Sequence, residues 1–212
     1  MKKLSLIIFL SFTVSAFSQK EKKRNIYKPY KVGFLYNYAT ANTIFKDPDY
    51  YYTTSVFKGQ LFYKLGDWKT LDFDLIVQPQ IQTLRHQLLN KHFVLDTEQN
   101  YIEKRNKYTQ LKNMSLYSVE FGVSVKKKII SIIEIVATVG LGLSYIDVRT
   151  ERLAKGFTFI ENGSFGINFK TTKTSSLYFG TNVGHVSNFE FSQPNKGYNI
   201  FGFEVGLSFI LK

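Results

Sequence analysis

The sequence contains no cysteine, and only four of its 212 residues are proline and one is tryptophan. Without cysteine, the chain cannot form a disulfide framework, a cysteine-ligated zinc site, a thiol nucleophile or a lipid-modified N-terminal cysteine. The scarcity of proline, beside 14 glycines, excludes a collagen-like or low-complexity chain. Acidic residues are also few: 16 Asp and Glu stand against 28 Lys and Arg, a formal net charge of +12. This balance favours an anionic partner, either nucleic acid or a phosphate-bearing lipid surface.

Apolar and aromatic side chains are abundant instead. Hydrophobic residues make up 44% of the chain and aromatic residues 17%, including 20 Phe and 14 Tyr. This content is too high for a disordered chain despite the net charge, and the length is typical of one domain. Beyond the N-terminus, no apolar run reaches the roughly 18 residues of a membrane helix, and no segment keeps a 3.6-residue apolar stripe over three turns.

The N-terminus has the three parts of a secretory signal peptide. Lys2 and Lys3 form the positive region, Leu4 to Val14 is the apolar run, and Ala16 to Ser18 supplies the small residues of a cleavage site. The apolar run is shorter than the roughly 18 residues of a membrane anchor. We therefore predict a signal peptide over residues 1–18 and a single domain over residues 19–212. Export from the cytoplasm argues against nucleic acid as the partner.

Eight segments of the mature chain alternate apolar residues with small or polar ones, as strands with two unlike faces do. Along Ile133 to Tyr145, seven consecutive positions of one face carry no charge, and the opposite faces of the segments are rich in Gly, Ser, Gln and Asn. The expected strands are Tyr30–Tyr38, Phe57–Leu65, Leu71–Ile81, Tyr117–Val125, Ile133–Tyr145, Phe157–Phe169, Leu177–Ser187 and Phe201–Leu211.

The connections between these segments alternate between short and long. Short polar turns on one side and long loops on the other are typical of outer-membrane barrels, as is an apolar outer face over a polar inner one. We therefore predict an all-β fold, an eight-stranded antiparallel transmembrane β-barrel of the outer-membrane type. The alternative is a soluble lipocalin-type barrel, which also has eight alternating strands but holds its apolar residues inside.

A candidate reactive pair lies near the end of the seventh strand, in the segment GHVSNFEFSQPNKGYN that spans Gly184 to Asn199. His185 and Ser187 are two residues apart, so on a strand their side chains point the same way. An imidazole beside a hydroxyl is the arrangement that activates a weak oxygen nucleophile. The face that they share is the apolar one, which is the lipid side of a membrane barrel, and polar groups are costly there unless they have partners or a function.

The whole string is more specific than the pair. H-x-S-N, followed by Q-P-N-x-G and a Phe-rich strand, resembles the lipid A 3-O-deacylase (PagL) family of outer-membrane esterases. The resemblance implies a Ser-His-acid triad that hydrolyses an ester-linked acyl chain of lipopolysaccharide. By motif position, Ser187 would be the nucleophile and His185 the general base, and the backbone N–H of Asn188 would help to form the oxyanion site.

Two positions depart from the family pattern. The triad acid of the family falls two residues after the motif glycine Gly197, where this chain has Asn199. An amide cannot stabilise imidazolium by charge, but it can hold the imidazole tautomer, as the third member does in Cys-His-Asn proteases. The second departure is Phe189 and Glu190, which stand where a small flexible residue is expected after the S-N pair.

A carboxylate on a neighbouring strand is a candidate for the missing acid. Paired positions of an antiparallel hairpin keep a constant sum, here roughly 347 for a turn centred near Lys173 and Thr174. His185 should therefore face a position near 161 to 163, and parity selects Glu161 or Gly163 on the outer face. Glu161 could pair with His185 and stabilise the imidazolium. Alternatively, it lies in the headgroup zone without a catalytic role.

The remaining titratable residues have simpler interpretations. Glu120 and Glu134 fall on the predicted lumen face, where we expect them to pair with interior lysines. His86 and His92 fall in the predicted loop from Arg85 to Asn113 and lack a metal-ligand pattern, so we interpret them as solvated. No phosphate-binding Gly-rich loop, EF-hand or HExxH motif is present.

Two functions from different classes are therefore compared. The first is an esterase of the cell outer membrane that acts on lipid A or lipopolysaccharide by a Ser-His mechanism, with outer-membrane lipid as partner and with no cofactor or metal. The alternative is a non-enzymatic eight-stranded barrel with a structural or adhesive role. The sequence leaves open which acyl chain is cleaved, whether Asn199 or Glu161 replaces the triad acid, and whether a homodimer forms.

Overall fold

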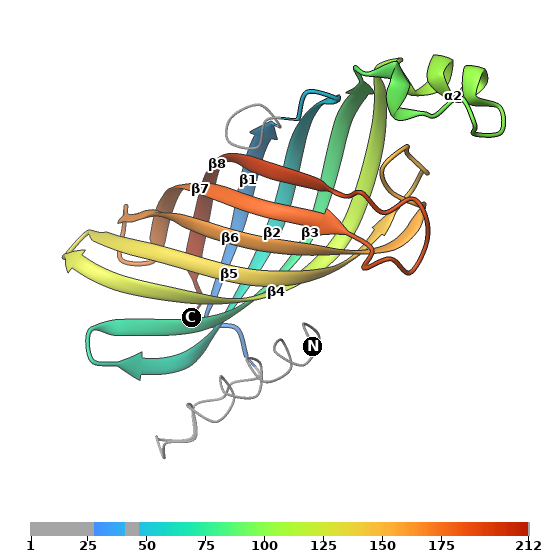
Figure 1. Cartoon of the computed structure of the whole chain (residues 1–212). Helices are drawn as coiled ribbons and strands as arrows, with labels where there is room; N and C mark the ends of the chain where they lie inside the picture. The colour runs from blue at the N-terminus through green and yellow to red at the C-terminus, as the bar shows by residue number, and fades with distance from the viewer. Residues whose placement is uncertain (1–27, 41–46, 212) are drawn as a thin grey trace.

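The computed structural model describes residues 28–40 and 47–211, so the predicted signal peptide lies outside the described residues. Eight antiparallel strands form one closed ring in which each strand pairs with its sequence neighbours and β8 pairs with β1 (Figure 1). This confirms the predicted fold. The strands are β1 Lys31–Thr40, β2 Tyr50–Trp68, β3 Leu71–Leu88, β4 Lys112–Ile130, β5 Ile133–Ile146, β6 Gly156–Lys170, β7 Ser175–Ser187 and β8 Tyr198–Ile210.

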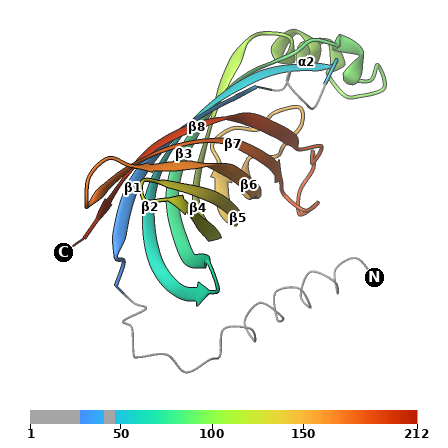
Figure 2. The same cartoon turned by 90° about the vertical axis from the view of Figure 1, so that its left-hand side faces the viewer.

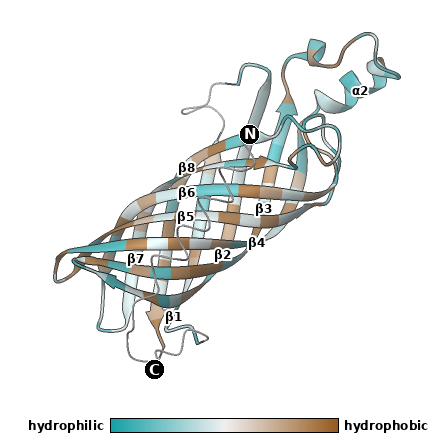
Figure 3. Cartoon of the chain, turned by 60° about the horizontal axis from the view of Figure 1, so that its bottom comes forward, coloured by the Kyte–Doolittle hydropathy of each residue, from teal (hydrophilic) through white to brown (hydrophobic). Residues whose placement is uncertain are grey.

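The apolar residues of the strands lie on the outside of the ring. Phe34, Phe57 and Phe203 are each at least 65% exposed. Hydrophobic and less hydrophobic positions alternate along the strands in Figure 3. A lipocalin-type barrel would place these side chains inside and polar ones outside. The observed faces are those of a barrel that contacts lipid, and the protein is an outer-membrane β-barrel.

The lumen is filled by hydrogen-bonded polar side chains. Glu120 is 1% exposed, and its carboxylate accepts hydrogen bonds from Gln78 Nε2 at 2.9 Å and Asn162 Nδ2 at 2.5 Å. Lys58 Nζ lies 3.4 Å from Glu120 and 3.9 Å from Glu204, so one buried cation is shared between two carboxylates. The interior of an eight-stranded ring is just wide enough for side chains to fill it, and in this protein the polar side chains fill the lumen.

The strands have opposite kinds of connection at their two ends. At one end, tight turns join β2 to β3 and β4 to β5. At the other end lie the 3-10 helix η1 (Lys91–Phe93), the helix α2 (Tyr101–Tyr108) and the β5–β6 and β7–β8 connections (Figures 1 and 2). Within the described residues, no helix is long and apolar enough to cross a membrane. We call this second end the long-loop end, which is extracellular in barrels of this type.

The interpretation of His86 as a solvated loop residue is wrong. Strand β3 continues to Leu88, and His86 is 1% exposed inside the barrel. The hydroxyl of Tyr50 lies 2.5 Å from His86 Nδ1, and Glu151 Oε1 lies 3.6 Å from the same nitrogen. The strands extend beyond the expected segment, and the β5–β6 connection covers the lumen there. The apolar alternation ends before the strand does, so it does not predict that β3 continues to Leu88.

Candidate active site

Four of the candidate residues lie on three neighbouring strands at the long-loop end. His185 and Ser187 end strand β7, and both side chains are partly exposed on the outer face. In the ladder, His185 pairs with Glu161 of β6 on one side and with Asn199 of β8 on the other. The hairpin arithmetic is therefore confirmed, since 161 + 185 gives 346 against the expected value of roughly 347.

Asn199 holds the imidazole of His185 by a hydrogen bond. His185 Nδ1 and Asn199 Oδ1 are 2.7 Å apart. An amide oxygen only accepts hydrogen bonds, so with this orientation of the amide Nδ1 carries the ring proton and Nε2 keeps its lone pair. A neutral ring with a free Nε2 is the form that can take a proton from a hydroxyl nucleophile.

The motif glycine is required at its position. Gly197 has a φ of +62°, a left-handed backbone that favours glycine. A Cβ there would lie 2.5 Å from the carbonyl oxygen of Val186, and 3.1 Å from Cε1 and 3.3 Å from Nε2 of His185. The backbone of residue 197 thus packs directly against the edge of the imidazole that carries the free nitrogen, and a side chain at this position would displace it.

Glu161 faces His185 from β6, on the opposite side from Asn199. Its side chain is exposed on the outer face, as parity predicted. Among the described residues, no ion pair joins the Glu161 carboxylate to His185, and the imidazole is hydrogen-bonded to Asn199 instead. The two candidates for the missing acid therefore flank the same histidine from its two neighbouring strands.

Asn188 is buried, at 1% exposure, and its hydrogen bonds lie within its own loop. Its backbone N–H donates to Asn195 Oδ1 at 2.8 Å, and its side-chain Nδ2 donates to the carbonyl oxygen of Ser192 at 2.8 Å. The expected oxyanion donor is therefore already paired in this structure. A substrate oxygen could use this N–H only in exchange for the Asn195 side chain.

The second departure from the family pattern has a structural counterpart. Phe189 and Glu190 both adopt positive φ, at 51° and 66°, which non-glycine residues rarely do. Asn188 Oδ1 accepts the N–H of Glu190 at 3.0 Å and holds this turn. The turn packs Phe189 against Phe159, with ring centroids 4.7 Å apart, and Phe159 is the ladder partner of Ser187. The bulky residue therefore packs on the aromatic ring of the strand position that pairs with Ser187.

The β5–β6 connection, residues 147–155, supports the loop that follows Ser187. The sequence predicts a long loop here but not this contact. The N–H of Lys196 donates to the carbonyl oxygen of Arg152 at 2.8 Å, and Ala154 donates to Pro194 at 2.9 Å. Arg152 in turn forms an ion pair with Asp47 at 2.6 Å. The only hint in the sequence is the charged run from Arg149 to Arg152, which strand alternation does not interpret.

Glu151 anchors this connection from inside the barrel. It is 7% exposed and lies 3.6 Å from both His86 Nδ1 and Lys112 Nζ. Burial alone would raise the pKa of its carboxyl. The nearby imidazole of His86 and the charge of Lys112 outweigh burial and lower this pKa below its ordinary value, so Glu151 stays ionised.

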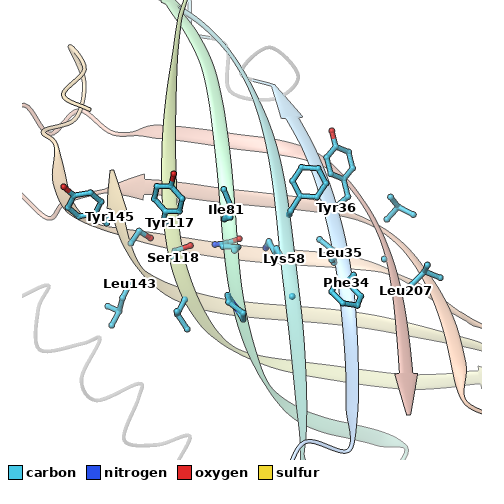
Figure 4. A pocket seen from close by; sticks show the side chains of 18 of the residues that line it. Phe34, Leu35, Tyr36, Lys58, Ile81, Tyr117, Ser118, Leu143, Tyr145 and Leu207 are labelled. Carbon is cyan, nitrogen blue, oxygen red and sulfur yellow. The ribbon is translucent and has the colours of Figure 1, made fainter. Parts of the chain in front are cut away.

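An apolar hollow against the barrel does not coincide with these residues. It has a volume of about 850 Å³ and is lined largely by outward apolar side chains at one level of the wall (Figure 4). None of the candidate catalytic residues lines it. We interpret it as part of the lipid-contacting surface; its labelled members include Phe34, Tyr36, Ile81, Tyr117, Leu143 and Tyr145.

A closed eight-stranded ring, with a filled lumen and an apolar outer face, defines the class: an outer-membrane β-barrel, here with a polar group around His185 on its lipid-facing rim. The model of the family described as lipid A 3-O-deacylase (PagL) matches residues 76–208, which is more than half of the chain. The chain belongs to this family, and the family is one of ester hydrolases.

Comparison with solved structures gives the same fold. The protein is similar to the crystal structure of the outer membrane enzyme PagL, with a TM-score of 0.53 and 12% identity, over 85% of this chain and 99% of that one. It is also similar to Neisserial surface protein A, with a TM-score of 0.45 and 10% identity, over 85% and 96% of the two chains. No curated protein matches the chain.

Proposed function

We propose that this protein is an outer-membrane esterase that removes an ester-linked acyl chain from lipid A by a Ser-His mechanism. The observation that carries the proposal is the hydrogen bond from His185 to Asn199 on the lipid-facing rim, with Ser187 two residues along the same strand. Membership of the lipid A 3-O-deacylase family supports this choice of substrate. A lipid in the outer leaflet would reach the site from the side, without entering the closed lumen.

In the first half of the reaction, Ser187 Oγ attacks the acyl carbonyl carbon and His185 Nε2 takes the hydroxyl proton. The tetrahedral intermediate collapses with cleavage of the bond to the sugar oxygen. The imidazolium returns its proton to that oxygen, so the sugar leaves as an alcohol and the acyl group remains on Ser187 as an ester.

In the second half, water attacks the acyl ester while His185 takes a proton from the water, and the fatty acid leaves as Ser187 recovers its hydrogen. Two groups assist His185. Asn199 fixes the proton on Nδ1, and Glu161, which faces His185 from β6, supplies the negative charge that Asn199 lacks. The N–H of Asn188 stabilises the oxyanion once Asn195 releases it.

The test is mass spectrometry of lipid A from cells that express the wild-type chain or Ser187→Ala. The wild-type chain should remove an acyl chain, and Ser187→Ala should lower turnover by at least roughly 10³-fold. The variant should still fold, because residue 187 is partly exposed at the end of a strand. Unchanged deacylation by Ser187→Ala would contradict the mechanism. Unmodified lipid A with the wild-type chain would instead favour a non-enzymatic barrel.

A further inference from the structure

A second polar cavity lies at the long-loop end, apart from the candidate catalytic residues. It has a volume of about 410 Å³, within the roughly 300–1,000 Å³ that is usual for ligand cavities. Its walls come from three parts of the chain: the end of α2, the start of β4 and the β5–β6 connection. Buried His86 and Thr150 form part of its floor.

The cavity holds more positive than negative charge. Lys107, Lys112, Arg149 and Lys155 line it, and Asp147 is its one lining carboxylate. Asp147 Oδ1 already accepts the backbone N–H of Ser115 at 2.9 Å. Lys112 lies 3.6 Å from buried Glu151. Within residues 28–40 and 47–211, the other three cations, which are exposed, form no ion pair, so they line the cavity without a paired carboxylate.

A neighbouring cavity of about 710 Å³ differs in this respect. Lys107 and Arg149 also line it, together with Lys104 and Lys196, but so do three carboxylates. One of them, Glu98, already forms an ion pair with Lys104 at 2.9 Å. Four cations stand against three carboxylates there, whereas four cations stand against one carboxylate in the smaller cavity, and Lys107 and Arg149 are common to both.

The smaller cavity is linked to the candidate active site through one loop. Arg149 and Lys155 belong to the β5–β6 connection, whose backbone carbonyl and N–H groups hold Pro194 and Lys196 in the loop after Ser187. These hydrogen bonds therefore fix the position of the cavity residues Arg149 and Lys155 relative to the loop after Ser187. A ligand that spans both places would have its anionic end held by the cavity and its ester presented on the rim.

We propose that this cavity is a binding site for a phosphate group of the lipid headgroup. Guanidinium and ammonium groups form short charge-assisted hydrogen bonds with phosphate oxygens, and Arg149 can do so with two donors at once. Tyr108 also lines the cavity, and Lys112 Nζ lies over its ring, 4.7 Å from the centroid. That the phosphate belongs to lipid A rests on the proposed function, whereas binding itself needs no catalysis.

The test therefore uses Ser187→Ala protein in detergent, so that bound lipid is not hydrolysed. One variant also carries Lys107→Gln, Arg149→Gln and Lys155→Gln. A matched control carries Lys69→Gln, Lys127→Gln and Lys173→Gln, which removes the same charge at the opposite end of the barrel. Each protein is titrated with lipid A that carries its phosphates, with the same lipid after phosphatase treatment, and with inorganic phosphate.

We expect the cavity variant to bind phosphorylated lipid A at least about tenfold more weakly than the control does, and the two proteins to bind the treated lipid equally. Competition by inorganic phosphate would support a general phosphate site, and absence of competition would support a headgroup site. Equal weakening for both lipids, or equal weakening in the control, would overturn the proposal. Deacylation by the wild-type chain is measured separately, so its absence would refute the proposed function and leave the binding comparison intact.

Discussion

The protein contains two groups of interacting polar side chains, one in the lumen and one on the lipid-facing rim, and they are built in opposite ways. In the lumen, Lys58, Glu120 and Glu204 are at most 5% exposed and share their contacts with amides of neighbouring strands. On the rim, His185 and Asn199 are partly exposed and share one hydrogen bond. The first group is closed to solvent, and the second leaves one imidazole nitrogen available.

Because of this difference, we expect the lumen group to contribute mainly to stability and the rim group mainly to activity. A charged group in the lumen is not solvated by water, so the loss of its partner leaves an uncompensated buried charge. A rim residue can be replaced without creating such a charge, so its loss should be felt mainly in the reaction. Each of the following variants tests one side of this comparison.

Lys58→Met should have the largest effect. It leaves Glu120 and Glu204 buried without their shared cation, so we expect a loss of about 3–5 kcal/mol in the free energy of unfolding. Urea unfolding in detergent measures this, with the exposed Lys127→Met as the control. Activity of the folded fraction should not change. A Lys58→Met barrel as stable as the control would show that the lumen charges are not needed for folding.

Gly197→Ala should affect the rim group, and therefore activity rather than stability. The new Cβ would approach Val186 O and the imidazole of His185, so the ring must shift, and we expect turnover to fall roughly 100-fold. Gly163→Ala is the matched control on the outer face, because a Cβ there meets only Val183 Cγ1 at 3.6 Å. If both variants have the same deacylation rate, the close packing against His185 has no catalytic importance.

Asn199→Ala and Glu161→Gln resolve the roles of the two residues that flank His185. Loss of Asn199 should lower turnover about tenfold, because general-base catalysis, usually worth about 10²–10⁴-fold, is partly retained when only the tautomer is no longer fixed. Glu161→Gln should lower turnover several-fold through loss of charge. Full activity in Glu161→Gln together with none in Asn199→Ala would assign the orienting role to Asn199 alone and remove Glu161 from the mechanism.

The smallest expected effect is a loss of stability of the β5–β6 connection at low pH. The lowered pKa of Glu151 means that this group stabilises the folded state above its ordinary pKa of 4.5, and that the contribution is lost as pH falls through the lowered value. Limited proteolysis of residues 147–155 at pH 7 and near pH 3 should therefore show faster cleavage in acid. Glu151→Gln should remove this difference. Cleavage rates that do not change with pH would show that the carboxylate does not hold the connection.

The sequence predicted best those features that repeat along the strands. Alternation placed Phe34 outside and Glu120 inside, and hairpin arithmetic placed Glu161 opposite His185 within one residue. These features depend on strand parity and turn position alone, which a single sequence contains.

Features that depend on contacts between loops were not predicted. The burial of His86 requires the β5–β6 connection to bring Glu151 over the lumen, and the engagement of the Asn188 N–H requires Asn195 to fold back over seven residues. No periodic pattern encodes such contacts. The bond from Asn199 to His185 is intermediate: the family motif indicated it, and only the register of β8 against β7 brings the two atoms together.

Strand β8 follows every other strand in the chain, and it pairs with β7 on one side and with β1 on the other. Its pairing with β1 closes the ring, and its pairing with β7 brings Asn199 to His185. Without β8, the imidazole would lack this hydrogen-bond partner, and β1 and β7 would each have an unpaired edge. One strand thus completes both the wall of the barrel and the surroundings of the histidine, so a change that loosens β8 would be felt in both.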